Sequence, residues 1–131
     1  MNAPRALALA AFAALLQACA TSAPEETKYT GEIFSGGRRL PVTTVFWEDR
    51  NDRTVGRYVF VEPDGREVPG TLGPCEMRNE VVLRCEWTDT YGQGYFFARF
   101  SEDRQSFRGR WGRGDLHHTL SIDGIWHGQQ R

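Results

Sequence analysis

The sequence predicts an all-β protein, an antiparallel up-and-down meander of about eight strands that closes into a small barrel. No long segment keeps apolar residues at the 3.6-residue spacing of an amphipathic helix. Apolar and polar residues instead alternate in short runs, and Gly, Pro, Asn and Asp separate these runs. We expect closure because a barrel leaves no unpaired edge strand, and a two-sheet β-sandwich is the alternative.

In the first half of the domain, strands are expected at residues 30–36, 39–48, 54–62 and 66–73. One face of the second strand carries Leu40, Val42, Thr44 and Phe46. In the third strand either face could be the buried one. The sequence Pro63-Asp64-Gly65 predicts a tight turn, because Pro suits its first central position and Gly its left-handed one. Pro69 weakens the fourth strand and indicates an edge strand or a bulge.

In the second half, strands are expected at residues 80–88, 95–100, 106–112 and 119–128. The polar segments between them are short, which favours pairing between sequence neighbours. Alternation in the first three of these strands predicts which residues point inward. They are Val81, Leu83, Cys85, Trp87, Phe96, Ala98, Phe100, Phe107, Gly109 and Trp111. In the last strand, Leu120 and Ile122 are expected on the core face.

The inner face of this second half is strongly aromatic. It carries Trp87, Phe96, Phe100, Phe107 and Trp111. The first interpretation is core packing, because each buried aromatic side chain contributes about 1.5–3 kcal/mol to the stability of a small domain. The alternative is a lined cavity for a small apolar ligand, since an eight-stranded barrel is just wide enough to hold one.

Residues 84–112, "RCEWTDTYGQGYFFARFSEDRQSFRGRWG", repeat glycine and aromatic residues at a period of two. They resemble the meanders of many small bacterial secreted proteins with barrel-like folds, and are similar in architecture to the calycin-like barrels, the avidins and lipocalins. The resemblance implies a small antiparallel barrel. It implies no ligand, because the polar contacts of the avidin biotin site cannot be matched residue by residue.

The N-terminus has the features of a secretory leader. Arg5 supplies a positive charge, and residues 6–16 form an apolar run too short for a membrane-spanning helix, which needs about 20 residues. The sequence Leu16-Gln17-Ala18-Cys19 then resembles the lipobox of bacterial lipoproteins. The resemblance implies a signal peptide at residues 1–18, cleavage before Cys19 and lipid attached to Cys19.

Lipid attachment would decide where the protein lies. Several acyl chains give stable anchoring, where a single chain would be marginal. Ala20 follows Cys19, in place of the Asp that is associated with retention at the inner membrane. We therefore expect a lipid-anchored protein of the bacterial outer membrane, facing the periplasm or the cell surface. Residues 19–28 predict a flexible tether, and residues 29–131 a single barrel-like domain.

The charge balance argues against nucleic acid as a partner. The formal net charge is −1 at pH 7, so the chain has no overall basic excess. The expected partners are the membrane, through the lipid, and either an envelope protein or a small apolar ligand. We expect no cofactor.

Cys75 and Cys85 remain once Cys19 is assigned to the lipid. The cell envelope is oxidising, so we expect a disulfide that cross-links a hairpin. Closing so short a loop stabilises a protein by about 2–3 kcal/mol in the chain-entropy model. The alternative is a metal site formed by both thiols and one of the histidines, His117, His118 and His127. The spacing of these residues matches no zinc pattern.

Arginines lie on the expected outer face of the aromatic strands, at Arg84, Arg99, Arg108 and Arg110. If neighbouring strands pair, these arginines form one patch, with Arg113 nearby. Acidic residues that could neutralise the patch and leave an ordinary solvated face are Glu86, Glu102 and Asp103. The alternative is a surface for an anionic partner, because guanidinium groups match the geometry of phosphate and carboxylate.

No catalytic site is expected. A hydrolase would need a nucleophile with a positioned base, and the sequence has no Gly-x-Ser-x-Gly motif. Candidate acid–base or metal-binding residues near the C-terminus are Asp115, His117, His118, Asp123 and His127. Their spacing matches no catalytic or metal motif, so a small hydrolase is the least favoured alternative.

The sequence therefore favours a lipid-anchored, non-enzymatic binding or interaction module of the cell envelope. A second hypothesis is an inhibitor or stabiliser of another envelope protein. Small lipid-anchored lysozyme inhibitors are similar in size, barrel and disulfide. Their Ser-Gly-x-[Lys/Arg]-Tyr loop has no complete match here, and residues 90–97 ("TYGQGYFF") depart from it.

Overall fold

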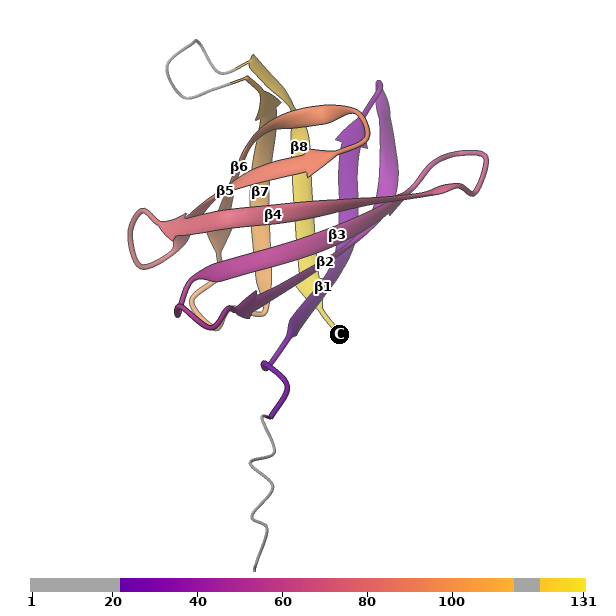
Figure 1. Ribbon diagram of the computed structural model, residues 1–131. Coiled ribbons are helices and arrows are strands. Elements are labelled where there is room, and N and C mark those ends of the chain that lie inside the picture. The colour runs from indigo at the N-terminus through magenta and orange to yellow at the C-terminus, as the bar shows by residue number, and fades with distance from the viewer. Residues whose placement is uncertain (1–21, 115–120) are drawn as a thin grey trace, which may run out of the picture.

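The chain folds into a closed barrel of eight antiparallel strands (Figure 1). The computed structural model describes residues 22–114 and 121–131. The strands are β1 (Thr27–Ser35), β2 (Arg38–Glu48), β3 (Thr54–Val61), β4 (Glu67–Met77), β5 (Val82–Asp89), β6 (Gly92–Phe100), β7 (Ser106–Arg113) and β8 (Ser121–Gln130). Each strand pairs with the next, and β8 pairs with β1. The predicted all-β meander and its closure are confirmed, and the β-sandwich alternative is wrong.

Strand β1 begins earlier than the sequence pattern indicates. It starts at Thr27, where residue 30 was expected, because Thr27 already pairs with Phe46 of β2. Further along, Tyr29 pairs with Thr44 on one side and with Gln130 of β8 on the other. Tyr29, which precedes the expected start of the strand, therefore helps to close the barrel.

The inward and outward faces follow the alternation expected for half-buried strands. In β3, for which the sequence did not indicate the buried face, Tyr58 and Phe60 point inward and are 2% and 3% exposed. In β7, Gly109 provides space for a neighbouring ring, because a Cβ there would lie 2.5 Å from a ring carbon of Phe96. The same Cβ would lie 2.8 Å from the carbonyl oxygen of Trp126. Small and large residues thus alternate to fill the interior.

Pro69 is not on an edge strand. It lies within β4 opposite Val59 of β3, in a sheet that has no edge. Strand β4 pairs with β5 only from Gly70 onward, so Pro69 lies where β4 has one paired neighbour. Its missing N–H therefore removes no hydrogen bond on the β5 side. The irregularity of β4 lies further along, where the register with β5 shifts between Leu72 and Cys75.

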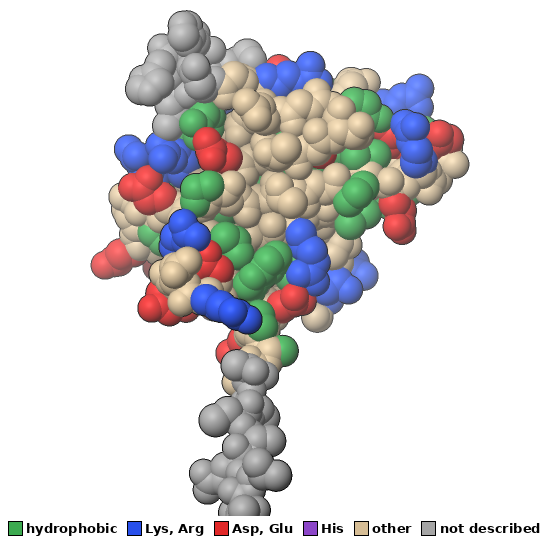
Figure 2. Space-filling model, viewed as in Figure 1, with side chains coloured by type: hydrophobic (Ala, Val, Ile, Leu, Met, Phe, Trp, Pro, Cys, Tyr) green, Lys and Arg blue, Asp and Glu red, His purple; other side chains and the backbone are tan. Residues whose placement is uncertain are grey.

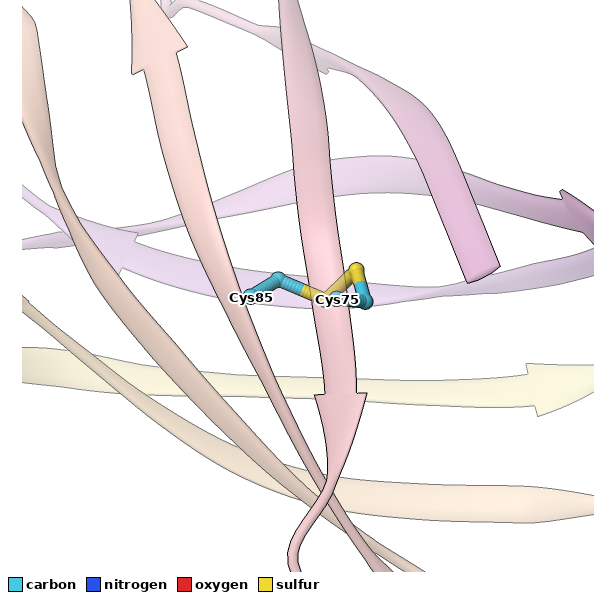
Figure 3. The surroundings of a disulfide bond; sticks show 2 residues. All are labelled: Cys75 and Cys85. Atoms are coloured by element: carbon cyan, nitrogen blue, oxygen red, sulfur yellow. A yellow bond between two sulfur atoms is a disulfide. The ribbon is translucent and has the colours of Figure 1, made fainter. Parts of the chain in front are cut away.

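The predicted disulfide is confirmed. Cys75 of β4 lies directly opposite Cys85 of β5, and the two sulfur atoms are bonded (Figure 3). Cys85 is fully buried, and Cys75 packs against the core from the side. Because both thiols are consumed, the alternative metal site that used them is wrong.

The barrel has two distinct ends. The lower end in Figure 1 holds the entry to β1, the C-terminus and the turns that follow β2, β4 and β6. The upper end holds the turns that follow β1, β3 and β5, together with the end of β7. A ligand that entered the interior would pass one of these ends, whereas a larger partner would meet the outer wall.

Candidate functional site

The five aromatic residues proposed to form either a core or a ligand pocket all face the interior. Their exposed fractions are 3% for Trp87, 0% for Phe96, 7% for Phe100, 1% for Phe107 and 8% for Trp111. Trp87 packs edge-on against Trp111 with 5.4 Å between ring centroids. Phe107 contacts the rings of Phe96 and Phe100 at 5.8 and 5.7 Å. The five side chains belong to one continuous core.

Trp126 is a further aromatic residue of this core. Trp126 of β8 is 1% exposed, and its ring centroid lies 4.3 Å from that of Phe96 and 4.6 Å from that of Tyr58. The sequence interpretation did not name Trp126, although glycines flank it at a period of two, as in the other aromatic strands. Of the two residues expected to face the core from this strand, Leu120 lies outside the described residues, and Ile122 pairs with Gly112.

The polar ends of the three buried indoles are used within the fold. Trp87 donates its Nε1–H to the carbonyl oxygen of Gly112 at 3.0 Å. Trp111 donates to the carbonyl oxygen of Phe34 at 2.9 Å. Trp126 donates to the hydroxyl oxygen of Thr44 at 3.0 Å. Each indole N–H thus has an acceptor within the fold, as buried tryptophans normally require, and none of the three points into an empty site.

The space left inside the barrel is small. A cavity of about 20 Å³ lies toward the upper end, between aromatic walls that include Tyr58, Trp87 and Trp111. That volume holds about one water molecule. Across the residues that the structure describes, the interior is therefore filled, and the aromatic side chains act as core.

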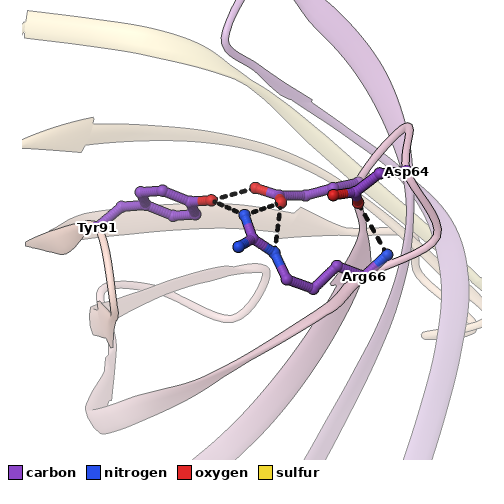
Figure 4. Close-up of polar contacts among 4 residues, drawn as sticks. Asp64, Arg66 and Tyr91 are labelled. Carbon is purple, nitrogen blue, oxygen red and sulfur yellow. Dashed lines mark hydrogen bonds and ion pairs between the residues drawn. The ribbon is translucent and has the colours of Figure 1, made fainter.

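Tyrosine hydroxyls close the upper end of the barrel. Tyr58 donates a hydrogen bond to Asp89 Oδ2 at 2.7 Å, and burial followed by this bond raises the pKa of Tyr58. Tyr91 donates to the carboxylate of Glu62, and Arg66 donates to the Tyr91 hydroxyl at 3.1 Å (Figure 4). The hydrogen bond from Tyr91, then that from Arg66, lowers the pKa of Glu62. The turns after β3 and β5 are joined by these contacts.

The four predicted arginines lie on the outer wall over β5, β6 and β7, and we call them the arginine face. Arg99 lies directly opposite Arg108 in the β6–β7 register. Arg84 and Arg110 lie one row away, on either side of Phe97. The face is therefore continuous. Arg113 pairs with Gly94 toward the upper end, so it lies away from this face.

Of the four arginines of the arginine face, only Arg84 forms an ion pair among the described residues. Arg84 forms an ion pair with Glu76 of β4 at 3.0 Å, and its guanidinium lies 5.7 Å from the Tyr95 ring centroid. Arg99, Arg108 and Arg110 are exposed, and the structure shows no ion pair for them among residues 22–114 and 121–131. Within the same residues, the expected neutralising acids, Glu86, Glu102 and Asp103, form no ion pair with these arginines.

Two arginines toward the opposite wall are paired with acidic side chains. Arg57 of β3 is held by Glu26 at 2.8 Å and lies over Trp47, with 5.1 Å from its guanidinium carbon to the ring centroid. Arg53 is paired with Asp49 at 3.1 Å. Figure 2, viewed as Figure 1 with β3 and β4 in front, shows blue and red side chains intermixed. Arg53 and Arg57 are thus neutralised locally, whereas Arg99, Arg108 and Arg110 lie together on one face with no ion pair among the described residues.

His127 extends the arginine face and was predicted only as a metal or acid–base candidate. It lies on β8 directly opposite Arg108 and, on its other side, opposite Glu32 of β1. Burial, then the positive charges of Arg108 and Arg39, lower the pKa of His127, and Glu32 opposes them. Its Nδ1 atom is buried, with no hydrogen-bond partner in the part of the chain that the structure describes.

The other C-terminal candidates are not brought together in a site. Asp115, His117 and His118 lie outside the described residues, as does Cys19. Asp123 accepts a hydrogen bond from the backbone N–H of Arg113 at 3.1 Å, which gives it a role in the β7–β8 pairing. Among residues 22–114 and 121–131, no three His, Cys, Asp or Glu side chains are grouped so that they could hold a metal ion.

Comparison of the chain with protein-family models, with curated proteins and with solved structures found no match. In the ranges that the structure describes, no helix has the length and apolar character needed to cross a membrane. The function proposed below therefore depends on the geometry of the barrel and on the N-terminal sequence.

Proposed function

We propose that this protein is a lipid-anchored, non-enzymatic binding module of the bacterial cell envelope, which binds an anionic component through the arginine face. The observation that carries the proposal is that Arg99 and Arg108 lie directly opposite each other on adjacent strands, and neither forms an ion pair within the part of the chain that the structure describes. Like charges placed directly opposite each other on adjacent strands destabilise a sheet. A bound anion would therefore reduce the repulsion between Arg99 and Arg108. The filled interior makes the outer wall the better candidate than an internal ligand site.

The anchor in this proposal is lipid on Cys19, and the expected location is the outer membrane. Residues 20–26 separate Cys19 from β1 and span at most about 25 Å when fully extended. The lower end of the barrel, where β1 begins, would then stay near the bilayer. Arg99 and Arg108 also lie near this end, because β6 ends at Phe100 and β7 begins at Ser106.

An inhibitor or stabiliser of an envelope protein stays the second hypothesis, since an acidic protein surface could also contact the arginine face. No contact among the described residues favours it over the first. The hydrolase hypothesis has no additional support, because the described candidates are dispersed between a backbone contact at Asp123 and the outer wall at His127.

Charge reversal tests the proposal. Arg99→Glu with Arg108→Glu should abolish cosedimentation of the chain from Ala20 onward with vesicles containing phosphatidylglycerol, while wild type binds. The matched control is Arg38→Glu with Arg50→Glu, which makes the same change in net charge at exposed positions away from the face. Equal loss in both variants would indicate a response to net charge alone, and unchanged binding of the Arg99 and Arg108 variant would refute the proposal.

A further inference from the structure

A row of basic side chains crosses three neighbouring strands on the outer wall. Arg99 of β6 is opposite Arg108 of β7, which is opposite His127 of β8. Neighbouring strands are about 4.8 Å apart, so the row extends for about 10 Å. Arg110 lies two residues from Arg108 on the same face of β7. A single phosphate group placed over Arg108 could therefore be reached from both sides.

The charged groups around His127 decide when it can join this row. Strand β7 presents Arg108 and strand β1 presents Glu32, each directly opposite His127. From β2, Arg39 reaches Glu32 at 3.8 Å, so the one carboxylate beside His127 is shared with another cation. Arg99 of β6 adds a more distant positive charge. The imidazole is thus surrounded by more positive than negative charge, which favours its neutral form.

Imidazole geometry leaves one nitrogen for a ligand. Nδ1 of His127 is buried and has no partner among the described residues. Nε2 is the other ring nitrogen, and it becomes a donor whenever the ring is protonated. Protonation therefore adds a positive charge beside Arg108 and ensures that Nε2 carries a proton to donate.

Building on the function proposed above, we infer that the row Arg99, Arg108 and His127 binds the phosphate of anionic lipid head groups, and that His127 takes up a proton when it binds. The phosphate supplies the negative charge that the surroundings of His127 lack. Guanidinium groups match phosphate geometrically, and the row lies near the end of the barrel at which a lipid anchor would enter. Phosphate on a membrane surface is the anion that this position favours.

Linkage fixes the direction of the pH dependence. In the free protein the pKa of His127 is lowered, so the ring is neutral near pH 8. A bound phosphate favours the charged ring and raises this pKa. Affinity must then increase as the pH falls through the pKa of the bound state, and it levels off once the free protein is also protonated.

The test measures vesicle binding at pH 8 and at pH 5.5, with vesicles of 30% phosphatidylglycerol in phosphatidylcholine, whose head-group charge is constant over this range. The chain from Ala20 onward is used, because strands β1 to β8 close into a barrel with its own core. Wild type should bind about fivefold more tightly at pH 5.5, the effect of about one added charge near an anionic membrane. His127→Gln should show no increase at pH 5.5, so that its affinity is the same at both pH values.

Controls separate this inference from the function on which it rests. His117→Gln with His118→Gln should keep the pH dependence, and loss of the dependence in that variant would overturn the role of His127. Equal binding of the wild-type protein at both pH values would also overturn the role of His127, but it would not contradict the function proposed for the arginine face. Loss of wild-type binding at both pH values would overturn both. Unfolding midpoints of each variant at both pH values verify that the barrel remains folded.

Two further measurements test the ligand chemistry. Inorganic phosphate at 10 mM, compared with chloride at equal ionic strength, should reduce vesicle binding by less than about twofold if head groups on a surface are the ligand. Complete displacement would identify free phosphate instead. Polyglutamate that bound more tightly than the vesicles would replace the lipid with an acidic protein as the preferred partner.

Discussion

Replacing Phe96 with Ala would measure how completely the barrel interior is filled. Phe96 is 0% exposed, and its ring centroid lies 4.3 Å from that of Trp126 and 5.8 Å from that of Phe107. Burial of a Phe side chain is worth about 1.5–3 kcal/mol, and the cavity left after its removal raises the cost of Phe→Ala to about 3–5 kcal/mol. We expect the free energy of unfolding to fall by about 4 kcal/mol.

The adjacent residue provides a matched control. Phe97 is on the outer wall, opposite Arg110, and is only partly buried. Phe97→Ala should therefore cost about 1 kcal/mol, because its ring leaves little cavity. The two substitutions remove the same atoms from neighbouring positions on opposite faces of β6.

Urea unfolding followed by tryptophan fluorescence would measure both effects. With a urea m-value of about 1.5 kcal/mol/M, Phe96→Ala should lower the unfolding midpoint by about 2.7 M, and Phe97→Ala by about 0.7 M. Equal shifts for the two variants, or a loss below about 1 kcal/mol for Phe96→Ala, would refute the packed interior. Such a result would mean that the Phe96 ring borders a vacant space that already lacks its contacts.

Three other outcomes follow from the fold and the leader. Replacing Cys75 and Cys85 with Ala should lower the free energy of unfolding by about 2–3 kcal/mol in urea titrations, because the bond closes a short loop; unchanged stability would contradict this role. Tyr58→Phe should cost about 1.5–3 kcal/mol by the same assay, because Asp89 loses a buried partner; a loss below about 0.5 kcal/mol would show that the bond contributes little. Cys19→Ala should move the protein from the membrane fraction to the soluble fraction in cell fractionation, and persistent membrane attachment would rule out the lipid anchor.

The strand pattern was predictable because each strand has one buried face. Alternation in residues 95–100 places Phe96 and Phe100 inward and Arg99 outward, and the structure confirms this. The disulfide was predictable from the compartment implied by the leader and from the spacing of Cys75 and Cys85. The strand inference depends on local sequence alone, and the disulfide inference needs the leader as well.

Register was not predictable, since alternation defines faces but not which residues lie opposite one another. From the sequence, Glu86 was expected to neutralise the arginine face, whereas the pairing of β4 with β5 places Glu76 beside Arg84. His127 joins the arginine face only because β8 pairs with β7 in one register. Trp126 could have been found from the glycines that flank it, which match the pattern of the other aromatic strands.

Contact between the arginine face and anionic lipid is the central claim, and paramagnetic relaxation measures it residue by residue. The chain from Ala20 onward would be mixed with nanodiscs that contain phosphatidylglycerol and a head-group spin label. The proposal predicts the strongest broadening at the backbone amides of Arg99, Arg108 and His127. Weak broadening is expected at Val59 of β3, on the opposite wall of the barrel. Uniform broadening, or broadening centred on β3, would contradict the proposed function.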